Sequence, residues 1–530
     1  MLSGVGADRK MRRRERKEYV SARQGSRVLP GKRVYLETMG CQMNVLDSEL
    51  VLGQLCALGY EPVDDWRSAD LVLLNTCSVR QHAEDKVYSR LGELRQVRQK
   101  QPETVIGVIG CMAERDHQGI AQRAPHVDLL CGPGSLNEIP ALLEEVAEQR
   151  SRNGARRGGG PLAVAVGRHR SRRLSGTQHA LLYDSIEALD RSRGGPVDGN
   201  VWQAYIRVQR GCDKFCAFCV VPFTRGPERS RPPAHILQEA SKLAGLGAKE
   251  ITLLGQTVNS YAYPDGGRTV RLAELLERLH AVDGLQRIRF VTSYPGDFTD
   301  DILQAMRDLP KVCEYLHLPA QSGSNAVLRR MKRPYTAEQY VDLIERARAI
   351  VPGLSLAGDF IVGFCGETQE DHQQTLALVE RARYKNIFMF RYSPRPGTAA
   401  DRRLADDVPE EIKRRRHADL VALQQRMSLA HHQALIGHKV EVLVESYSKA
   451  AIKAQEAEQA RGQEVSWRRS DQLTGRTRGD EIVVFNGPPS LIGQLVTVQV
   501  EAATALTLHG RVLAGSQALL PVAGWSAPPP

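Results

Sequence analysis

Three cysteines lie close together in the segment GCDKFCAFC, which begins at Gly211. Cys212 and Cys216 are separated by three residues, and Cys216 and Cys219 by two. Thiolates at such spacing bind zinc or iron-sulfur clusters, and both kinds of site have four ligand positions. No fourth cysteine follows until Cys313. The spacing therefore favours a 4Fe-4S cluster with one iron left open for chemistry, while zinc with a distant histidine remains an alternative.

A second set of cysteines, Cys41, Cys77 and Cys111, follows separate apolar runs near the N-terminus. These runs are predicted strands over 33–38, 71–75 and 105–109. Because the carboxyl ends of parallel strands share one edge of a sheet, where ligands bind, we expect the three cysteines to converge. The alternative is three unrelated cysteines, since cysteine is a common buried residue.

The segment over 32–149 alternates strands with helices. A fourth apolar run, VDLLCGP, follows the other three, and helical periodicity is found over 47–58, 83–98 and 137–149. This alternation predicts an open α/β sheet. Over 150–198 the composition shifts to Arg, Gly and Ser, which predicts a basic linker that is disordered or ordered only on binding.

Strand and helix patterns resume at about residue 200. The predicted strands are AYIRVQR, EITLLGQ, RIRFVTS, EYLHLPA, LSLAGDFIVGF and NIFMFRYS, with helices starting near 233, 270, 299, 336 and 369. Six such units are too few for an eight-stranded barrel and suit a partial one. The cysteines that begin with Cys212 follow its first strand, at the carboxyl-terminal mouth.

The pattern changes to all-β after a charged helix over about 409–436. KVEVLVES, LTGRTRGDEIVVF, GQLVTVQV and LHGRVL are short strands with Gly-rich turns, which predict a small closed barrel of the kind that binds oligonucleotides. A polar insertion near 448–470 interrupts it, and a tail over 515–530 ends the chain.

Basic residues exceed acidic ones, 72 against 61, for a formal net charge of +11. The excess is clustered over 9–17, 150–173 and 412–416. Such clusters favour a polyanionic partner, nucleic acid first, although a basic surface can also serve only solubility. No apolar run approaches the roughly 18 residues of a membrane span, and no secretory signal is evident, so we expect a cytoplasmic protein.

The pattern CxxxCxxC after the first strand of a barrel resembles the radical S-adenosylmethionine enzymes. In that family, S-adenosylmethionine binds the open iron of a 4Fe-4S cluster, and its reductive cleavage gives a 5′-deoxyadenosyl radical. The resemblance implies that Phe218 lies near the adenine of this cosubstrate. It also implies that Gly255, Gln256 and Asn259, in LLGQTVNSY, line the cosubstrate pocket.

TMGCQMNVLDSE, NTCSVR, GCMAER, HLPAQSGS, GDFIVGF and YSPRPGTAA narrow the resemblance to the methylthiotransferase family, whose C-terminal barrel is a TRAM domain. The resemblance implies that Cys41, Cys77 and Cys111 hold a second 4Fe-4S cluster. It implies an enzyme that adds a methylthio group at C2 of N6-dimethylallyladenosine, next to the tRNA anticodon, and consumes two S-adenosylmethionine molecules. The alternatives are threonylcarbamoyladenosine tRNA or a ribosomal protein as the target, or a noncatalytic RNA-binding metalloprotein.

Two departures from the family pattern concern pocket geometry. TSYP over 292–295 stands where TSHP is common, and Cys365 stands where proline is usual. We interpret the remaining cysteines as structural; they are Cys56, Cys131, Cys313 and Cys365.

The resulting expectation is a multidomain α/β chain, a monomer that binds a tRNA anticodon loop and receives electrons from a donor such as flavodoxin or ferredoxin. Its expected parts are a basic N-terminal extension (1–31), the N-terminal domain (32–149), the linker (150–198), the radical core (199–430), the TRAM domain (431–514) and the tail (515–530).

Overall fold

The computed structural model describes residues 31–78, 81–153, 163–167, 176–193, 201–453 and 471–513. The chain separates into two compact units, the first formed by 1–168 with 181–193 and the second by 169–180 with 194–530. Of the helices in these described stretches, none is both long and apolar enough to cross a membrane.

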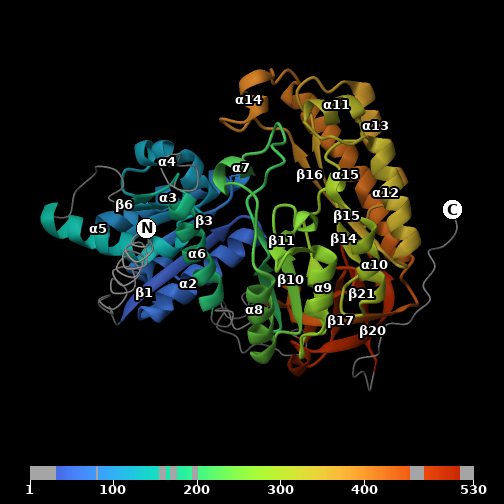
Figure 1. The fold of residues 1–530 in the computed structure, drawn as a ribbon, viewed down its shortest axis with the longest axis horizontal. Helices are drawn as coiled ribbons and strands as arrows, with labels where there is room; N and C mark the ends of the chain where they lie inside the picture. The colour runs from blue at the N-terminus through green and yellow to red at the C-terminus, as the bar shows by residue number, and fades with distance from the viewer. Residues whose placement is uncertain are drawn as a thin grey trace, which may run out of the picture. The chain divides into compact units, whose positions relative to one another are not determined.

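The first unit is built on a parallel sheet with the strand order β2-β1-β3-β4-β5-β6. Figure 1 shows its helices beside this sheet. Every residue of the central strand β3 (Leu71–Thr76) is buried, as expected for a parallel strand with both faces covered. The other elements of this unit are β1 (Lys32–Met39), α2 (Gln42–Ala57), β2 (Tyr60–Pro62), α3 (Gln81–Lys100), β4 (Val105–Gly110), α4 (Cys111–Arg123), β5 (Leu129–Cys131), α5 (Ile139–Asn153) and β6 (Ala163–Ala165).

The predicted linker over 150–198 contains regular structure. Strand β6 pairs in parallel with β5 and extends the sheet, and helix α6 runs over Gly176–Ser192. The side chain of Asn137 donates a hydrogen bond of 3.1 Å to Ser185 Oγ of this helix. The expectation of a structureless linker is therefore wrong for 150–153, which end helix α5, and for 163–167 and 176–193, while residues 154–162, 168–175 and 194–198 and the extension over 1–30 lie outside the described residues.

The second unit begins with the predicted partial barrel. Strands β13-β10-β7 form one parallel group and β14-β15-β16 another. Backbone hydrogen bonds connect the groups, because Ile288 of β13 donates to Lys311 and accepts from Cys313, at 2.6 and 2.9 Å. One continuous hydrophobic core joins the six strands to the helices around them. The expected six-stranded architecture is confirmed.

The strands of this barrel are β7 (Gln203–Arg207), β10 (Glu250–Leu254), β13 (Arg287–Phe290), β14 (Tyr315–His317), β15 (Ser355–Val362) and β16 (Asn386–Arg391). Its helices are α7 (Val221–Thr224), α8 (Pro233–Gly245), α9 (Leu272–His280), α10 (Asp300–Asp308), α11 (Asn325–Arg330), α12 (Ala337–Ile350), α13 (Gln369–Ala382), α14 (Ala399–Arg403) and α15 (Glu410–Gln433). Two small hairpins complete it, β8 (Gln209–Arg210) with β9 (Arg229–Ser230), and β11 (Ala262–Asp265) with β12 (Arg268–Arg271).

The C-terminal strands close into the predicted small barrel, in the order β17-β18-β19-β21-β20. The strands are β17 (Lys439–Tyr447), β18 (Gln472–Thr477), β19 (Ile482–Asn486), β20 (Leu495–Ala503) and β21 (Leu508–Val512). Alternating residues such as Val442, Val444, Val496 and Val498 fill its interior, which matches the period of two in each strand. Of the polar insertion near 448–470, residues 454–470 lie outside the described chain.

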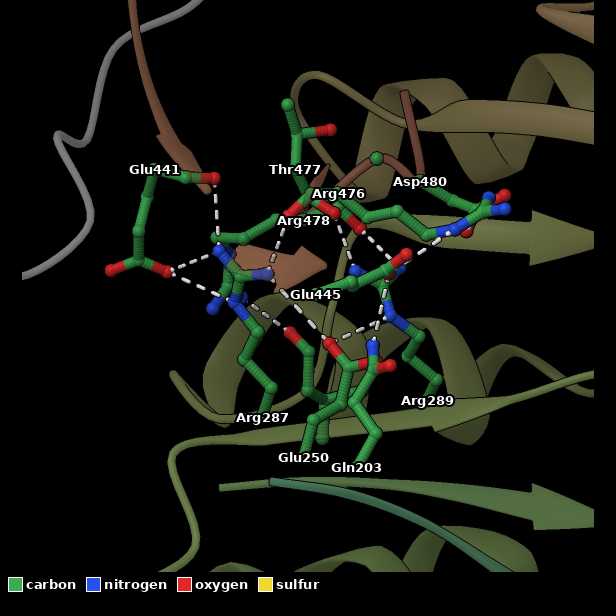
Figure 2. Close-up of polar contacts among 12 residues, drawn as sticks. Gln203, Glu250, Arg287, Arg289, Glu441, Glu445, Arg476, Thr477, Arg478 and Asp480 are labelled. Carbon is green, nitrogen blue, oxygen red and sulfur yellow. Dashed lines mark hydrogen bonds and ion pairs between the residues drawn. The ribbon is translucent and has the colours of Figure 1, made fainter. Parts of the chain in front are cut away.

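The small barrel joins the amino-terminal ends of the core strands through buried arginines of β13 (Figure 2). Arg287, 1% exposed, donates to Glu441 Oε1 at 2.8 Å and to the carbonyl oxygen of Arg476 at 2.9 Å. Arg289, 5% exposed, donates to the carbonyl oxygen of Arg478 at 2.7 Å. These contacts, here called the arginine clamp, attach the turn between β18 and β19 to the core.

Carboxylates and amides complete the arginine clamp from the core side. Glu250 of β10 forms an ion pair of 3.0 Å with Arg289 Nε. Gln203 of β7 donates to both Glu250 Oε1 and Glu445 Oε1, each at 3.1 Å, and so links the core to the small barrel (Figure 2). A buried arginine requires such partners, since an unpaired charge in the interior is costly.

Candidate functional site

Cys41, Cys77 and Cys111 lie at the carboxyl ends of three neighbouring strands. Cys77 and Cys111 each directly follow the last residue of β3 and β4, and Cys41 lies two residues after the end of β1. The backbone N-H of Cys77 donates to the carbonyl oxygen of Met39 at 3.1 Å. The structure thus brings these three cysteines to one sheet edge, as the parallel-strand argument predicted.

Two asparagines support this edge and explain the glycines before two of the cysteines. Asn44 Oδ1 accepts a hydrogen bond from Cys41 Sγ at 3.2 Å, and its amide donates to Asn75 at 3.0 Å. A Cβ atom at Gly40 would lie 2.5 Å from Asn44 Oδ1, and one at Gly110 would lie 2.4 Å from Asn75 Oδ1. Each glycine therefore lets its strand end approach an asparagine that holds the cysteine segments together.

An arginine links two of the sequence motifs behind the cysteines. Arg115 of GCMAER donates to Ser78 Oγ of NTCSVR at 3.0 Å and to Glu84 at 2.8 Å. Ser78 Oγ in turn donates to the other oxygen of Glu84 at 3.1 Å. All three side chains are largely buried, so this triangle fixes Ser78, the residue after Cys77, relative to helix α4.

The second cysteine set, Cys212, Cys216 and Cys219, lies in the segment between β8 and α7, beyond the carboxyl end of β7. Burial, together with the nearby charge of Cys216, raises the pKa of Cys212 to about 11 and that of Cys219 to about 12. These thiols cannot all ionise side by side without a positive group between them. Iron supplies such charge and deprotonates its thiol ligands, so this set fits a metal cluster.

A buried arginine stands beside this cysteine set. Arg333, 7% exposed, donates to Cys216 Sγ at 3.7 Å and to the carbonyl oxygen of Pro319 at 2.9 Å. Its guanidinium also lies 4.8 Å from the centroid of the Tyr294 ring. Although burial favours the neutral form, the charges of Tyr335 and Cys216 hold the pKa of Arg333 above its ordinary value. The site therefore keeps a fixed positive charge against one thiol.

The four residues expected to line the cosubstrate pocket differ in their contacts. Phe218 is half-buried and makes an edge contact with Phe364, with ring centroids 6.4 Å apart. Gly255 follows β10, and a Cβ atom there would lie 3.2 Å from Gln209 Oε1. Asn259 is buried and binds the Tyr294 backbone at both ends of its amide, at 2.9 and 2.6 Å, so it positions the segment after β13.

Gln256 differs from these residues because its Oε1 atom is buried without a hydrogen-bond partner. Gln209 Nε2 and Ser293 Oγ are buried and unpartnered in the same way, after β7 and β13 respectively. Buried polar atoms are nearly always satisfied in native proteins, and at the carboxyl ends of the barrel strands such atoms are available to a water, an ion or a ligand. Sequence reasoning selected Gln256 but missed Gln209 and Ser293, whose only signal was their place just beyond a strand end.

Within the described ranges, no group of three or more Cys, His, Asp or Glu side chains is gathered around a single metal position. This finding gives no support to a preformed zinc site in that part of the chain. It does not conflict with a cubane, because each cysteine ligand of a 4Fe-4S cluster binds a different iron atom.

The basic cluster over 412–416 is only partly available for RNA. Lys413 and Arg416 are buried, and their side chains bind Asp406 at 2.6 Å and Glu367 at 2.9 Å. They lie on one face of helix α15, three residues apart, and that face packs inward. The expectation that this cluster contacts a polyanionic partner is therefore wrong for these two residues, while Arg414 and Arg415 are exposed.

The four cysteines outside the two sets differ in burial. Cys131, Cys313 and Cys365 are buried, in agreement with a structural role, whereas Cys56 is exposed at the end of helix α2.

Family comparisons match three successive regions of the chain. Residues 33–132 match the uncharacterized protein family UPF0004, residues 206–379 the radical SAM superfamily, and residues 463–513 the TRAM domain. Radical SAM proteins hold a 4Fe-4S cluster and S-adenosylmethionine. The three regions correspond to the α/β sheet, the partial barrel and the C-terminal small barrel, which confirms the predicted fold class.

Curated relatives resemble the chain over nearly its whole length. The tRNA-2-methylthio-N(6)-dimethylallyladenosine synthase of Rhodopirellula baltica is 49% identical over 91% of this chain and 95% of that protein. The synthases of the same name from Moorella thermoacetica and Syntrophotalea carbinolica are 41% and 39% identical, over 90% and 89% of this chain and 98% of each relative. A solved radical S-adenosylmethionine methyltransferase from Kitasatospora setae covers 70% of this chain and 77% of its own, with a TM-score of 0.48 and 16% identity.

Proposed function

Because the chain belongs to the tRNA-2-methylthio-N(6)-dimethylallyladenosine synthase family, we infer that it transfers a methylthio group to N6-dimethylallyladenosine in tRNA. The observation that carries this inference is the similarity over nearly the full length, 49% identity over 95% of the relative. The family matches over 33–132 and 206–379 contain the two cysteine sets. The family consists of enzymes, so the alternative of a noncatalytic metalloprotein is not retained.

Each cysteine set is proposed to hold one 4Fe-4S cluster. Cys212, Cys216 and Cys219 would hold the cluster whose open iron takes S-adenosylmethionine, and the set at the sheet edge, which begins with Cys41, would hold the second. Two observations support the fit, the raised thiol pKa values of Cys212 and Cys219 in the first set and the shared strand ends of the second. When bound, the clusters and S-adenosylmethionine would supply the electron transfer, radical and sulfur chemistry that side chains lack.

The protein's own residues would bind the cosubstrate and hold the cysteine segment in position. The unpartnered Oε1 of Gln256 is a hydrogen-bond acceptor suited to the ammonium or hydroxyl groups of the cosubstrate. Lys214 forms an ion pair with Asp297, which also accepts from Ser260 Oγ at 2.6 Å, so the cysteine segment is tied to the segment after β13. Arg333 places a positive charge against Cys216. Together these contacts would hold the cluster segment rigid and exclude water.

The RNA partner is proposed to be the tRNA anticodon loop. The TRAM match and the net charge of +11 support a grip on phosphates. The basic clusters over 9–17 and 150–173 lie largely outside the described residues, and Arg152, Arg414 and Arg415 are arginines of the predicted basic surface that the structure shows exposed. The expectations of a monomer and of flavodoxin or ferredoxin as electron donor rest on the family resemblance alone.

An anaerobic assay with dimethylallyl-modified tRNA, S-adenosylmethionine and a reductant tests this function. We expect Cys212→Ala to abolish both 5′-deoxyadenosine and the methylthio nucleoside. We expect Cys77→Ser to abolish the methylthio nucleoside while 5′-deoxyadenosine still forms, because the first cluster is intact. Cys56→Ser is the matched control in the same unit and should retain both products.

Two outcomes would overturn the assignment. A methylthio product found only on threonylcarbamoyladenosine would move the chain to another substrate, and mass spectrometry of the nucleosides separates the two. Unchanged methylthio product in Cys77→Ser would remove the second cluster from the sheet edge.

A further inference from the structure

A pocket of about 270 Å³ opens beside the cysteine segment of the second unit. Its lining comes from three stretches that are distant in sequence, namely the cysteine segment with α7, the turn after α11, and helix α14. The lining residues are Phe215, Cys216, Phe223, Lys332, Ala399, Arg402 and Arg403. We call this the rim pocket.

Two residues of the rim pocket have a strained backbone. Phe215 and Lys332 have φ angles of +47° and +57°, in the left-handed region that residues other than glycine rarely occupy. Such a conformation costs on the order of 1–3 kcal/mol and persists where the surroundings enforce it, often at binding sites. Their neighbours supply that enforcement, because Lys214 is paired with Asp297 and Arg333 is fixed by Cys216 and Pro319.

The strain places an aromatic ring and a cation on the same pocket. The Phe215 side chain is 51% exposed, and its ring is steadied by an edge contact with Phe223 at a centroid distance of 6.3 Å. Lys332 is exposed as well. An exposed ring beside a cation can stack against a ligand with a flat face.

The rim pocket carries positive charge without a matching carboxylate. Among the described residues, neither Lys332 nor Arg403 has a recorded ion pair, and both are exposed. Arg402 donates to the carbonyl oxygens of Thr398 and Gly397, at 3.4 and 2.7 Å, which fixes its side chain but leaves its charge unbalanced. No Asp or Glu lines the pocket.

We propose that the rim pocket binds one nucleotide of the RNA substrate, adjacent to the base that is modified. Its base would stack on Phe215, and its phosphates would contact Lys332 and Arg403, with Arg402 beside them. Single-stranded RNA is recognised by this combination of aromatic stacking and cationic contact to the backbone. Cys216 lines the pocket, so the bound nucleotide lies next to the proposed cluster. The proposal rests on the proposed function and adds a subsite to it.

The charge of the rim pocket argues against the cosubstrate as its ligand. S-adenosylmethionine carries a sulfonium cation, which three unbalanced cations repel. The unpartnered polar atoms suited to that cosubstrate belong to Gln256, Gln209 and Ser293, none of which lines the rim pocket. An acidic electron-transfer protein would match the charge, but a concave pocket with one exposed ring suits a nucleotide better than a flat protein face.

Binding of a dimethylallyl-modified anticodon stem-loop to the cluster-loaded protein tests the proposal. Arg403→Ala removes a cation that makes no hydrogen bond or ion pair with the described residues. Lys332→Asn removes another while tolerating the left-handed backbone, and Phe215→Leu keeps bulk without the ring. We expect each to raise the Kd roughly tenfold, the size of a charge-assisted contact or a base stack. Arg329→Ala, an exposed arginine of α11 outside the pocket, should leave the Kd unchanged.

Stem-loops with single neutral methylphosphonate linkages identify the phosphate. A methylphosphonate at one particular linkage beside the modified base should weaken binding to the unaltered protein. The same substitution should not weaken binding to the Arg403→Ala variant any further, because that variant already lacks the contact. RNA-free reductive cleavage of S-adenosylmethionine should be equal in all variants, which verifies folding and the cluster.

Three results would overturn the proposal. The first is an unchanged Kd for the stem-loop in all three variants. The second is a raised KM for S-adenosylmethionine in the RNA-free reaction of these variants. Slower reduction by flavodoxin at unchanged RNA affinity would assign the surface to the electron donor. If the unaltered protein forms no methylthio product but the variants still bind RNA less tightly, the proposed function fails and the RNA subsite stands.

Discussion

At the scale of single residues, the glycine before a cysteine is as constrained as the cysteine. Gly110 has a φ of +92°, and an added Cβ atom would meet Asn75 Oδ1 at 2.4 Å and the carbonyl oxygen of Thr76 at 2.8 Å. The backbone oxygen cannot move away without disturbing β3. In the dipeptide Gly-Cys, the glycine is therefore required for packing, just as the cysteine is required as a proposed cluster ligand.

We expect Gly110→Ala to lower the iron content of the protein and the yield of methylthio nucleoside, because the segment that carries Cys111 must shift. Gly53→Ala is the matched control. Gly53 lies inside helix α2 with nothing within 4 Å of an added Cβ, so this change should stabilise the protein, by up to about 1 kcal/mol. Iron per chain and thermal unfolding measure the two effects, and equal iron content in both variants would contradict the argument.

Arg333 leads to a prediction about redox chemistry. A fixed positive charge near Cys216 stabilises the more negative, reduced form of a cluster held there. We expect Arg333→Met to shift the midpoint potential of that cluster to a more negative value, as read by a redox titration with electron paramagnetic resonance. Arg329→Met, an exposed arginine on the same stretch, should leave the potential unchanged. A shift in the positive direction would refute the role.

At the scale of elements, strands and long amphipathic helices could be predicted from periodicity. The six core strands and the helices near 233, 270, 299, 336 and 369 follow the expected pattern because each buries one apolar face. Helix α2, however, begins at Gln42, where apolar periodicity gave a start near 47. Asn44 accepts the Cys41 backbone N-H at 3.4 Å, in the position where a capping box usually has Glu or Gln, so the usual start signal was missing.

Strand β6 and helix α6 could not be predicted because they lie in a stretch rich in Arg, Gly and Ser, a composition typical of linkers. Strand β6 has only three residues, and its stability comes from pairing with β5, which no local pattern reveals. Ile186 and Leu189 of α6 are buried at helical spacing within an otherwise Arg-rich and Gly-rich stretch. The two cysteine sets could be predicted because Cys212, Cys216 and Cys219 are close in sequence, whereas Cys41, Cys77 and Cys111 each follow an apolar run long enough to be recognised as a strand.

The arginine clamp leads to a prediction about stability. Removing one partner of a buried ion pair leaves the other charge uncompensated, at a cost of about 3–5 kcal/mol. We therefore expect Arg289→Met to lower the free energy of unfolding by roughly that amount, since Glu250 loses its ion-pair partner and two carbonyl oxygens lose their donor. Arg307→Met, whose partner Asp308 is on the surface, is the control and should leave the free energy of unfolding nearly unchanged. Denaturant unfolding measures both, and equal effects would exclude a tight clamp.

At the scale of the whole molecule, the net charge determines how strongly the affinity for RNA depends on salt. An excess of basic residues that gives +11 predicts binding dominated by phosphate contacts. We expect tRNA affinity to fall linearly on a double logarithmic plot as salt rises. Filter binding between low and high salt measures the slope, and an affinity that is independent of salt would contradict this view.

Acid sensitivity of the second unit follows from carboxylates in the turn that meets the core. Burial alone raises the pKa of Glu481, but a hydrogen bond from His431 and the charge of Lys385 hold that pKa well below its ordinary value. The charge of Lys385 likewise contributes to the lowered pKa of Asp480, against burial. Burial raises the pKa of Glu445 and offsets part of the effect.

A carboxyl group with a lowered pKa in the folded state stabilises the fold fully above its unfolded pKa, about 4.3 for Glu, and loses this contribution as pH falls further. We expect the β18–β19 hairpin to open more often as pH drops below that value. Amide hydrogen exchange of the hairpin, corrected for intrinsic rates, measures the opening. Glu481→Gln should flatten the pH dependence, whereas Glu501→Gln, on the exposed barrel surface, should not.

The arginine clamp binds mainly backbone oxygens of the small barrel, those of Glu441, Arg476, Thr477 and Arg478. Main-chain atoms are supplied by any amino-acid sequence, so the core recognises the shape of a turn and few of its side chains. A barrel taken from a distant relative should therefore be transplantable onto this core if the turn keeps its length and Asp480 its φ of +68°. The same feature frees the outer face of the barrel to diverge, so that RNA preference can change by exchange of one module while the radical chemistry is inherited intact.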